Sequence, residues 1–464
     1  MHGFDGATGD EVFAYIPDDA MGLDLAGGEI PGSRHVLKDL VERLVAGNNG
    51  AINHKFFLSG PPIVNDAFLR SDFSGDDRWH TMLTFGRARG GRFVTGLDVT
   101  NPLNPLLRFN KGNREGISDP DSIDPTLTYD GLGETWSPPV MGNVFSDPLA
   151  GPTRIDQWVA FLGAGYGCNN ANFEGHHLYA LRVEDGSIYY RGQVSNNSSA
   201  AIPYNALVAM PTLYNPHQVD VADNKDYTTR VYIGDVQGNI WKLVTDQADP
   251  ANWSLVKFAE VGLDQPITAA VAILADANNQ QVYVMAGTGG DTRVDATTTD
   301  FKLVGYIDND AEGANTAQYP LGSTPFWDQP LNPEERVYVT PVTIGQVGDT
   351  VPALVFFAGS KAEFDPNECN TGFTSTLYAL GIESGLAEVD LDGTGGDDES
   401  VGLGEGKVTG IMARDGNLYV SESGGLGSSS DMKVFGDGKF DDELPAHGSF
   451  SVQVLVDSFR VSPF

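Results

Sequence analysis

Basic residues, cysteine and long apolar runs are all scarce in this chain of 464 residues. Only 28 Lys and Arg stand against 63 Asp and Glu, which gives a formal net charge of −35. A chain this acidic repels phosphate backbones, so we expect no nucleic-acid partner and favour cations instead. No stretch of about 18 apolar residues occurs, so we expect no transmembrane helix.

Cysteine is nearly absent, because Cys168 and Cys369 are the only two, and neither has a Cys-x-x-Cys neighbour. Two alternatives stay open: one disulfide, which fits an oxidising compartment, or two buried free thiols. The opening Met1-His2-Gly3-Phe4-Asp5 lacks the charged and apolar regions of a signal peptide. We therefore expect a piece of a longer protein whose N-terminal region is missing and whose targeting signal lies upstream.

Long helical periods are also missing, because 56 Gly and 26 Pro interrupt the apolar runs after a few residues. One short helix is predicted near residues 36–47. The abundant unit is instead the hairpin, seen best from Val231 to Val244. There, two β-branched and aromatic runs are joined by a loop rich in Gly, Asn and Asp, which is typical of an antiparallel hairpin.

Looser copies of this hairpin recur along the chain, and together with it they give markers near Phe4, Leu97, Tyr179, Trp241, Val304, Tyr378 and Val434. These repeats predict an all-β fold, a modified β-propeller of about seven blades with long loop insertions, as one domain over residues 1–464. The alternative is two stacked β-sandwich domains. The alternating tail Ser449 to Val456 is expected to complete the last blade or to join the N-terminal one.

Several segments occur in the order expected of one known family: Gly3–Pro17, His54–Pro62, Trp79–Leu83, Gly90–Phe93, Gly96–Pro102, Thr135–Pro139, Gly163–Gly167, Tyr232–Lys242 and Pro266–Ala270. They resemble the C-terminal propeller of the PilY family, the type IV pilus tip-associated adhesins and biogenesis factors. The resemblance covers about residues 1–290, and beyond it only the blade-like spacing continues.

The resemblance implies a non-enzymatic protein that is exported through the periplasm to the cell surface and is associated with the type IV pilus. Implied partners are the minor pilins or the pilus tip, with a host or abiotic surface as the target of adhesion. Members of the family usually carry an N-terminal region, often similar to a von Willebrand factor A domain, which is missing here.

The same resemblance implies a calcium loop ahead of the Tyr-x-Gly-Asp hairpin, with the pattern Asp-x-Asn-x-Asp-Gly-x-x-Asp. The matching stretch offers oxygen ligands from Asp220, Asp223, Asn224 and Asp226, and calcium requires six to eight such oxygens. It departs from the pattern, because Lys225 stands where the Gly is expected and Thr replaces the final Asp. The alternative is an acidic hairpin loop that binds nothing.

A second candidate calcium loop carries Asp390 and Asp392 in an Asp-x-Asp-Gly opening, although a solvated insertion explains it as well. Two further motifs have structural explanations. Adjacent residues His176 and His177 point to opposite faces of a strand, so an ordinary strand start is favoured over a metal site. The glycine-rich segment 163–167 precedes no helix and is interpreted as an inner strand or tight turn.

No Gly-x-Ser-x-Gly elbow and no His-Glu-x-x-His motif occurs, so we expect no enzyme. Two alternatives to the pilus function remain. The segment from Phe4 to Phe13 looks like the blade signature of quinoprotein dehydrogenases, although Phe13 replaces their Trp and no adjacent cysteine pair is present. The other alternative is a structural surface propeller unrelated to pili, since a propeller fold does not fix a function.

Overall fold

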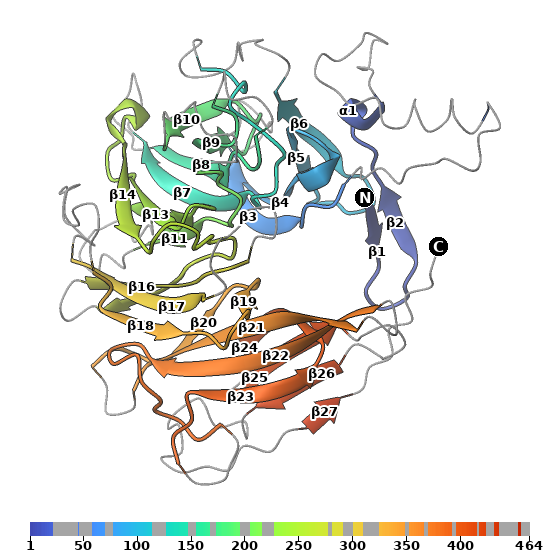
Figure 1. The fold of residues 1–464 in the computed structure, drawn as a ribbon. Coiled ribbons are helices and arrows are strands. Elements are labelled where there is room, and N and C mark those ends of the chain that lie inside the picture. Colours follow the sequence, from blue (N-terminus) through green and yellow to red (C-terminus); the bar gives the residue numbers. More distant parts are fainter. Residues whose placement is uncertain are drawn as a thin grey trace. The chain divides into compact units, whose positions relative to one another are not determined.

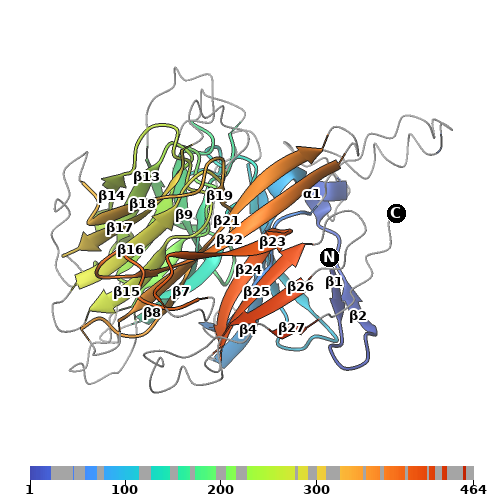
Figure 2. The same ribbon diagram turned by 60° about the horizontal axis from the view of Figure 1, so that its bottom comes forward.

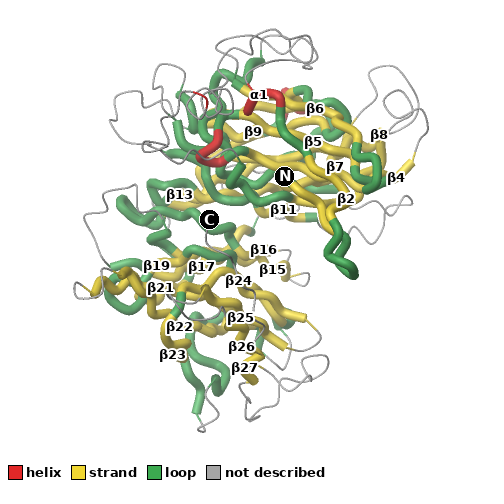
Figure 3. Tube along the Cα trace, turned by 90° about the vertical axis from the view of Figure 1, so that its right-hand side faces the viewer, coloured by secondary structure: helices red, strands yellow, loops and turns green. Residues whose placement is uncertain are grey.

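The computed structural model describes residues 1–21, 45, 58–69, 78–113, 127–146, 155–167, 173–194, 205–215, 227–276, 281–290, 300–309, 324–348, 352–365, 370–391, 396–414, 417–423, 431–435 and 453–455. Strands and loops make up nearly all of this trace, and helices appear only as short segments (Figure 3). The expected all-β class is confirmed. The helix predicted near residues 36–47 lies outside the described residues except for Val45, and Cys168 and Cys369 also lie outside them.

The chain divides into two compact units, and the first comprises Met1–Asp235 and Trp241–Val256. It opens with a two-stranded sheet and a short helix: β1 (His2–Phe4), β2 (Glu11–Ala14) and α1 (Asp18–Met21). The next sheet contains β3 (Ile63–Leu69), β4 (Arg78–Gly86), β5 (Phe93–Asp98) and β6 (Leu106–Gly112), with the 3-10 helix η1 (Ala88–Gly90) after β4.

Two more four-stranded sheets complete the first unit (Figure 1). One contains β7 (Val140–Ser146), β8 (Ile155–Gly163), β9 (His177–Arg182) and β10 (Ile188–Gln193). The other contains β11 (Thr212–Tyr214), β12 (Arg230–Gly234), β13 (Asn239–Val244) and β14 (Ser254–Glu260), with the 3-10 helix η3 (Pro250–Asn252) before β14. Parts of β13 and β14 are assigned to the second unit.

The second unit comprises Val236–Ile240 and Lys257–Phe464. Its first sheet contains β15 (Ala272–Asp276), β16 (Gln281–Gly287), β17 (Lys302–Asp308) and β18 (Trp327–Pro330). Its second contains β19 (Arg336–Val337), β20 (Val342–Ile344), β21 (Leu354–Asp365), β22 (Asn370–Gly381) and β23 (Ser400–Glu405). Its third contains β24 (Lys407–Arg414), β25 (Asn417–Ser423), β26 (Asp431–Phe435) and β27 (Gln453–Leu455). The long hairpin of β21 and β22 stands out in Figure 2.

Each of the four-stranded sheets is an antiparallel meander whose strands follow one another in chain order, and in the five-stranded sheet β19 and β20 both pair with β21. Neighbouring sheets meet through their early strands: β3 and β11 both contact β7 in the first unit, and β15 and β24 both contact β20 in the second. Four-stranded meanders stacked in this way are successive propeller blades. The chain therefore has a β-propeller fold, while the number of about seven blades and the single domain over 1–464 stay predictions.

The hairpin predicted from Val231 to Val244 is present as β12 and β13. Every residue of both strands is buried, and Gly238 in the turn has a φ of +88°, which glycine adopts without strain. The aspartate and tryptophan of the motif meet: Trp241 Nε1 donates to Asp235 Oδ2 at 2.8 Å. Asn205 Nδ2 donates to the same oxygen at 2.7 Å, so the buried carboxylate has two donors.

The apolar faces of neighbouring sheets pack into separate cores. In the first unit, Phe161, Trp241 and Trp253 belong to a core shared by the second and third sheets. In the second unit, another core joins Phe301 and Trp327 to the sheet of β21 and β22. The tail residues Gln453–Leu455 pair with β26, so the tail completes the last described sheet, one of the two predicted alternatives.

Candidate functional site

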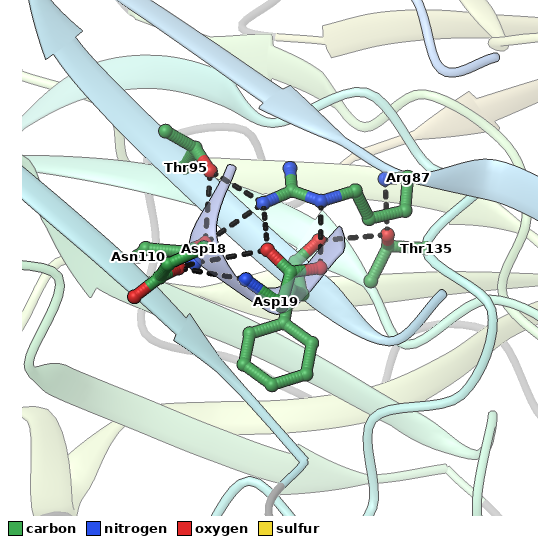
Figure 4. Close-up of polar contacts among 7 residues, drawn as sticks. Asp18, Asp19, Arg87, Thr95, Asn110 and Thr135 are labelled. Atoms are coloured by element: carbon green, nitrogen blue, oxygen red, sulfur yellow. Dashed lines mark hydrogen bonds and ion pairs between the residues drawn. The ribbon is translucent and has the colours of Figure 1, made fainter. Parts of the chain in front are cut away.

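Six polar residues meet beneath the N-terminal helix, and we name them the Arg87 cluster: Asp18, Asp19, Arg87, Thr95, Asn110 and Thr135. Arg87 follows β4, and its side chain is fully buried. Its Nε donates to Asp19 Oδ2 at 3.1 Å and its Nη2 donates to Asp19 Oδ1 at 2.7 Å, a two-point ion pair. Figure 4 shows the Asp19 carboxylate directed at the guanidinium, with Thr95 and Asn110 beside it.

The Arg87 cluster holds α1 against the sheet of β3 to β6. Asp19 is only 5% exposed, and Asn110 Nδ2 donates both to Asp18 and, at 2.9 Å, to Asp19 Oδ1. A buried charge that loses its partner costs several kcal/mol, so the ion pair strongly favours the docked helix. Because solvent does not reach the guanidinium, the cluster acts as a structural clamp and not as a surface for a dissolved ligand.

Thr135 extends the clamp to the segment that leads into β7. Its Oγ1 accepts a hydrogen bond from Arg87 N at 2.6 Å and donates one to Phe93 O at 2.9 Å. One buried hydroxyl therefore joins the end of β4, the start of β5 and the approach to the next sheet. The predicted segment Thr135–Pro139 is thus a connection between two sheets.

The glycine-rich segment 163–167 lies where three chain segments cross closely. Gly165 N donates to Leu207 O, and Tyr166 N donates to Glu134 O. Gly165 has a φ of +77°, and a Cβ there would lie 1.7 Å from Glu134 O. Gly163 ends β8, and Gly165 and Tyr166 form isolated bridges, so of the two predicted alternatives the segment is closer to the inner strand than to the tight turn. Any side chain at Gly165 would collide with backbone.

The two adjacent histidines are both buried, as expected for a strand start. His177 Nε2 lies 3.1 Å from Arg191 Nη2, whose guanidinium also forms an ion pair with Asp130 at 2.7 Å. Burial, followed by the charge of Arg191, lowers the pKa of His177 to about 3. Within the described ranges, no group of three or more His, Cys, Asp and Glu residues is placed to hold a metal ion.

A buried His–Asp pair in the first large sheet has the composition of a catalytic dyad, but both side chains form contacts with neighbouring residues of the sheet. His80 Nδ1 lies 2.7 Å from Asp98 Oδ2, and Arg78 Nε lies 3.3 Å from His80 Nε2. Burial alone would raise the pKa of Asp98, but hydrogen bonds from Thr100 and Arg108 lower it to about 2. Both ring nitrogens of His80 thus have neighbours within the protein, and the pair stabilises the sheet.

The predicted calcium ligands are described only in part. Asp220, Asp223, Asn224 and Asp226 lie outside the described residues, in the connection between β11 and β12, and Asp392 also lies outside them. Asp390 is described and half-buried. Beside it, Leu391 N donates to Asp398 Oδ2 at 3.2 Å, and Asp398 N donates to Val389 O at 2.8 Å. Asp398 therefore binds the chain on both sides of Asp390, once through its side chain and once through its backbone.

Sequence reasoning missed the Arg87 cluster, because Asp19 and Arg87 are 68 positions apart. Two local signals were available. The first was Pro17 followed by two acidic residues, which is typical of a helix start, and α1 begins there. The second signal was an arginine directly after the apolar run of β4, since a charge at the end of a buried strand needs a partner.

The family model described as the PilY1 beta-propeller domain matches residues 1–335. The type IV pilus biogenesis factor PilY1 of Pseudomonas aeruginosa (strain UCBPP-PA14) is 25% identical over an alignment of 353 residues that covers 69% of this chain and 25% of that protein. A PilY1 homolog of Xylella fastidiosa is 25% identical over an alignment of 296 residues that covers 62% of this chain and 16% of that protein. This chain therefore spans a quarter or less of the length of these relatives.

Among solved structures, the crystal structure of the Pseudomonas aeruginosa PilY1 C-terminal domain is similar, with a TM-score of 0.60 and 19% sequence identity. The similarity covers 91% of this chain and 89% of that domain, and at this identity it shows the fold alone. The family match extends past residue 290, where the sequence motifs become weak, and includes the sheets of the first unit and the sheet of β15 to β18 in the second. The chain belongs to the PilY1 β-propeller domain family.

Proposed function

We propose that this chain is the propeller part of a type IV pilus biogenesis factor, which acts at the pilus tip as an adhesin. The observation that supports this most is the family match over residues 1–335. The curated relatives that match are pilus biogenesis factors, and the matched region contains the Arg87 cluster and the glycine crossing at Gly165. Both features fix chain segments of the first unit, and binding residues in many proteins lie on loops that such a framework positions.

The proposed partners are minor pilins or the pilus tip, with a host or abiotic surface as the adhesion target. The proposed location is extracellular, after export through the periplasm. In the described residues, no helix is long and apolar enough to span a bilayer. The net charge of −35 favours contact with cationic groups over anionic ones.

The test is deletion of the parent gene and complementation with the full-length gene or with a copy that lacks residues 1–464. We expect loss of surface pili and of attachment in the deletion strain, rescue by the full-length gene, and no rescue by the truncated copy. Immunoblots of the truncated product control for its expression and export. Normal pili and attachment after deletion would refute the proposal.

Calcium binding is a separate part of the proposal and rests on the acidic loops of the sequence. We propose Asp220, Asp223, Asn224 and Asp226 as one ligand set, and the loop of Asp390 and Asp392 as a second. Calorimetry should show calcium heats that are reduced in the variant with both Asp220→Ala and Asp226→Ala, with magnesium as the control ion. Equal heats in wild type and variant would remove this loop as a site.

The protein is proposed to be non-enzymatic. The segment that looks like a quinoprotein signature forms the turn between β1 and β2. There, Asp5 Oδ1 accepts from Ala7 N at 2.8 Å and from Thr8 N at 3.1 Å. We expect no dye-linked alcohol oxidation after incubation with pyrroloquinoline quinone and calcium, and turnover above that of a heat-treated sample would contradict the proposal.

A further inference from the structure

Three aromatic side chains form an exposed corner in the first unit, and we name Phe68, Trp79 and Trp158 the aromatic corner. The ring centroid of Trp79 lies 5.8 Å from that of Phe68, with an angle of 77° between the ring planes. It lies 5.6 Å from the ring centroid of Trp158, with an angle of 74°. Trp79 is nevertheless 58% exposed. A tryptophan with two edge-to-face aromatic neighbours is usually buried, so the exposure of the Trp79 ring is unusual.

The aromatic corner is built on regular strands and is therefore preformed. Phe68 on β3 and Trp79 on β4 are directly opposite each other in the antiparallel register. Trp158 lies on β8, where its carbonyl oxygen accepts from Gln157 Nε2 at 3.0 Å and from Val183 N at 3.1 Å, and its side chain packs against the buried core that contains Met82 and Met141. A ligand that enters this corner does not need to order the rings first.

An acidic group lies on the same face as the corner. Asp66 precedes Phe68 by two positions on β3, and Thr81 follows Trp79 by two on β4, so the four side chains share one side of the sheet. Thr81 Oγ1 donates to Asp66 Oδ1 at 2.7 Å, and both residues are on the solvent-facing part of the strands. The carboxylate is thus about 7 Å along the strand from the rings.

We propose that the aromatic corner binds a quaternary ammonium group, such as the trimethylammonium of choline. The faces of tryptophan and phenylalanine rings attract cations, and a quaternary nitrogen requires no hydrogen-bond acceptor. The carboxylate of Asp66 and the net charge of −35 add attraction for a cation and repel an anion. A neutral apolar group of the same shape lacks this electrostatic attraction. The site is independent of the predicted calcium loops and goes beyond the proposed pilus function.

The experiment titrates the 464-residue chain with choline and with 3,3-dimethyl-1-butanol, a neutral analogue of the same shape, and follows tryptophan fluorescence and heat. We expect choline to bind and the neutral analogue to bind at least about tenfold more weakly. Vesicles of phosphatidylcholine, compared with vesicles of phosphatidylglycerol, show whether a lipid headgroup is also accepted as the source of the ammonium group.

Three variants locate the site. Trp79→Leu should weaken choline binding about tenfold and Asp66→Asn about threefold, because each removes one part of the attraction. Phe326→Leu is the matched control, since this ring in the second unit is 54% exposed and also has an edge-to-face neighbour, Tyr283. It should leave binding unchanged.

Circular dichroism and a melting curve confirm that each variant is folded, and Trp79→Phe keeps a ring in case the leucine variant does not fold. Choline that does not bind at millimolar concentration, a neutral analogue that binds equally well, or a folded Trp79→Leu variant that binds normally would each overturn the proposal.

Discussion

Glu184 lies in the turn between β9 and β10 and is only 3% exposed. Its Oε2 accepts a hydrogen bond from Gln157 Nε2 at 2.9 Å. Burial raises the pKa of this carboxyl from 4.5 to about 7, because desolvation outweighs the hydrogen bonds that favour the charged form. Between about pH 4.5 and 7, the native state therefore keeps a proton on Glu184 that the unfolded chain has already released.

The difference between the native and the unfolded pKa of Glu184 determines how the stability changes with pH. Because the native state holds the proton more tightly, the contribution of Glu184 to stability is fully present below about pH 4.5 and is lost as the pH rises through about 7. The two pKa values differ by about 2.5, which at 1.36 kcal/mol per pKa unit corresponds to about 3 kcal/mol. Above pH 7 the protein thus contains a buried carboxylate that destabilises it by about this amount.

The substitution Glu184→Gln tests this reasoning, because glutamine keeps the shape of the side chain and cannot ionise. At pH 8 we expect the variant to gain up to about 3 kcal/mol in the free energy of unfolding relative to wild type, and at pH 5 we expect little difference. Urea unfolding followed by tryptophan fluorescence, repeated from pH 5 to 8.5, measures both.

Other groups titrate in the same range, so the difference between variant and wild type is the informative quantity. His177 acts in the opposite direction, because its native pKa is lowered from 6.5 to about 3. Between these pH values the unfolded chain binds a proton that the native state does not, so stability falls as the pH falls. Glu405→Gln is the matched control, because it makes the same chemical change at an exposed position of β23. A stability difference for Glu184→Gln that is the same at pH 5 and pH 8 would refute the reasoning.

Three further substitutions test the packing that we describe. Asp19→Ala leaves the buried guanidinium of Arg87 without its partner and should cost about 3–5 kcal/mol of unfolding free energy, measured by urea unfolding; a loss below 1 kcal/mol would mean that α1 is not clamped. Gly165→Ala places a Cβ 1.7 Å from Glu134 O at a φ of +77° and should cost about 3 kcal/mol or more, seen as a lower melting temperature; an unchanged temperature would contradict the crossing. Trp241→Phe removes a hydrogen-bond donor from the buried carboxylate of Asp235 and should cost about 1–3 kcal/mol, measured by urea unfolding; wild-type stability would contradict this.

Local patterns in the sequence were enough to predict the sheets. In the segment Val231 to Val244, both strands and the turn are specified within fourteen consecutive residues, and the structure has the hairpin at these positions. At the glycine-rich segment 163–167 the sequence left an inner strand and a tight turn as alternatives, and the structure has the end of β8 followed by isolated bridges. The number of residues between repeats also indicated meanders of several strands, although the insertions hide where each sheet begins.

The contacts that join distant segments could not be predicted, because nothing in the sequence near one partner specifies the other. Asp19 looks like a helix-start residue and Arg87 like the end of a strand, and only the fold places the two charges 2.7 Å apart in a buried site. The aromatic corner has the same origin, since Trp79 and Trp158 belong to different sheets. A buried charge pair and a group of exposed edge-to-face rings both depend on how sheets pack against each other. The local sequence shows which type of residue is present, but it does not show which residue that side chain will contact.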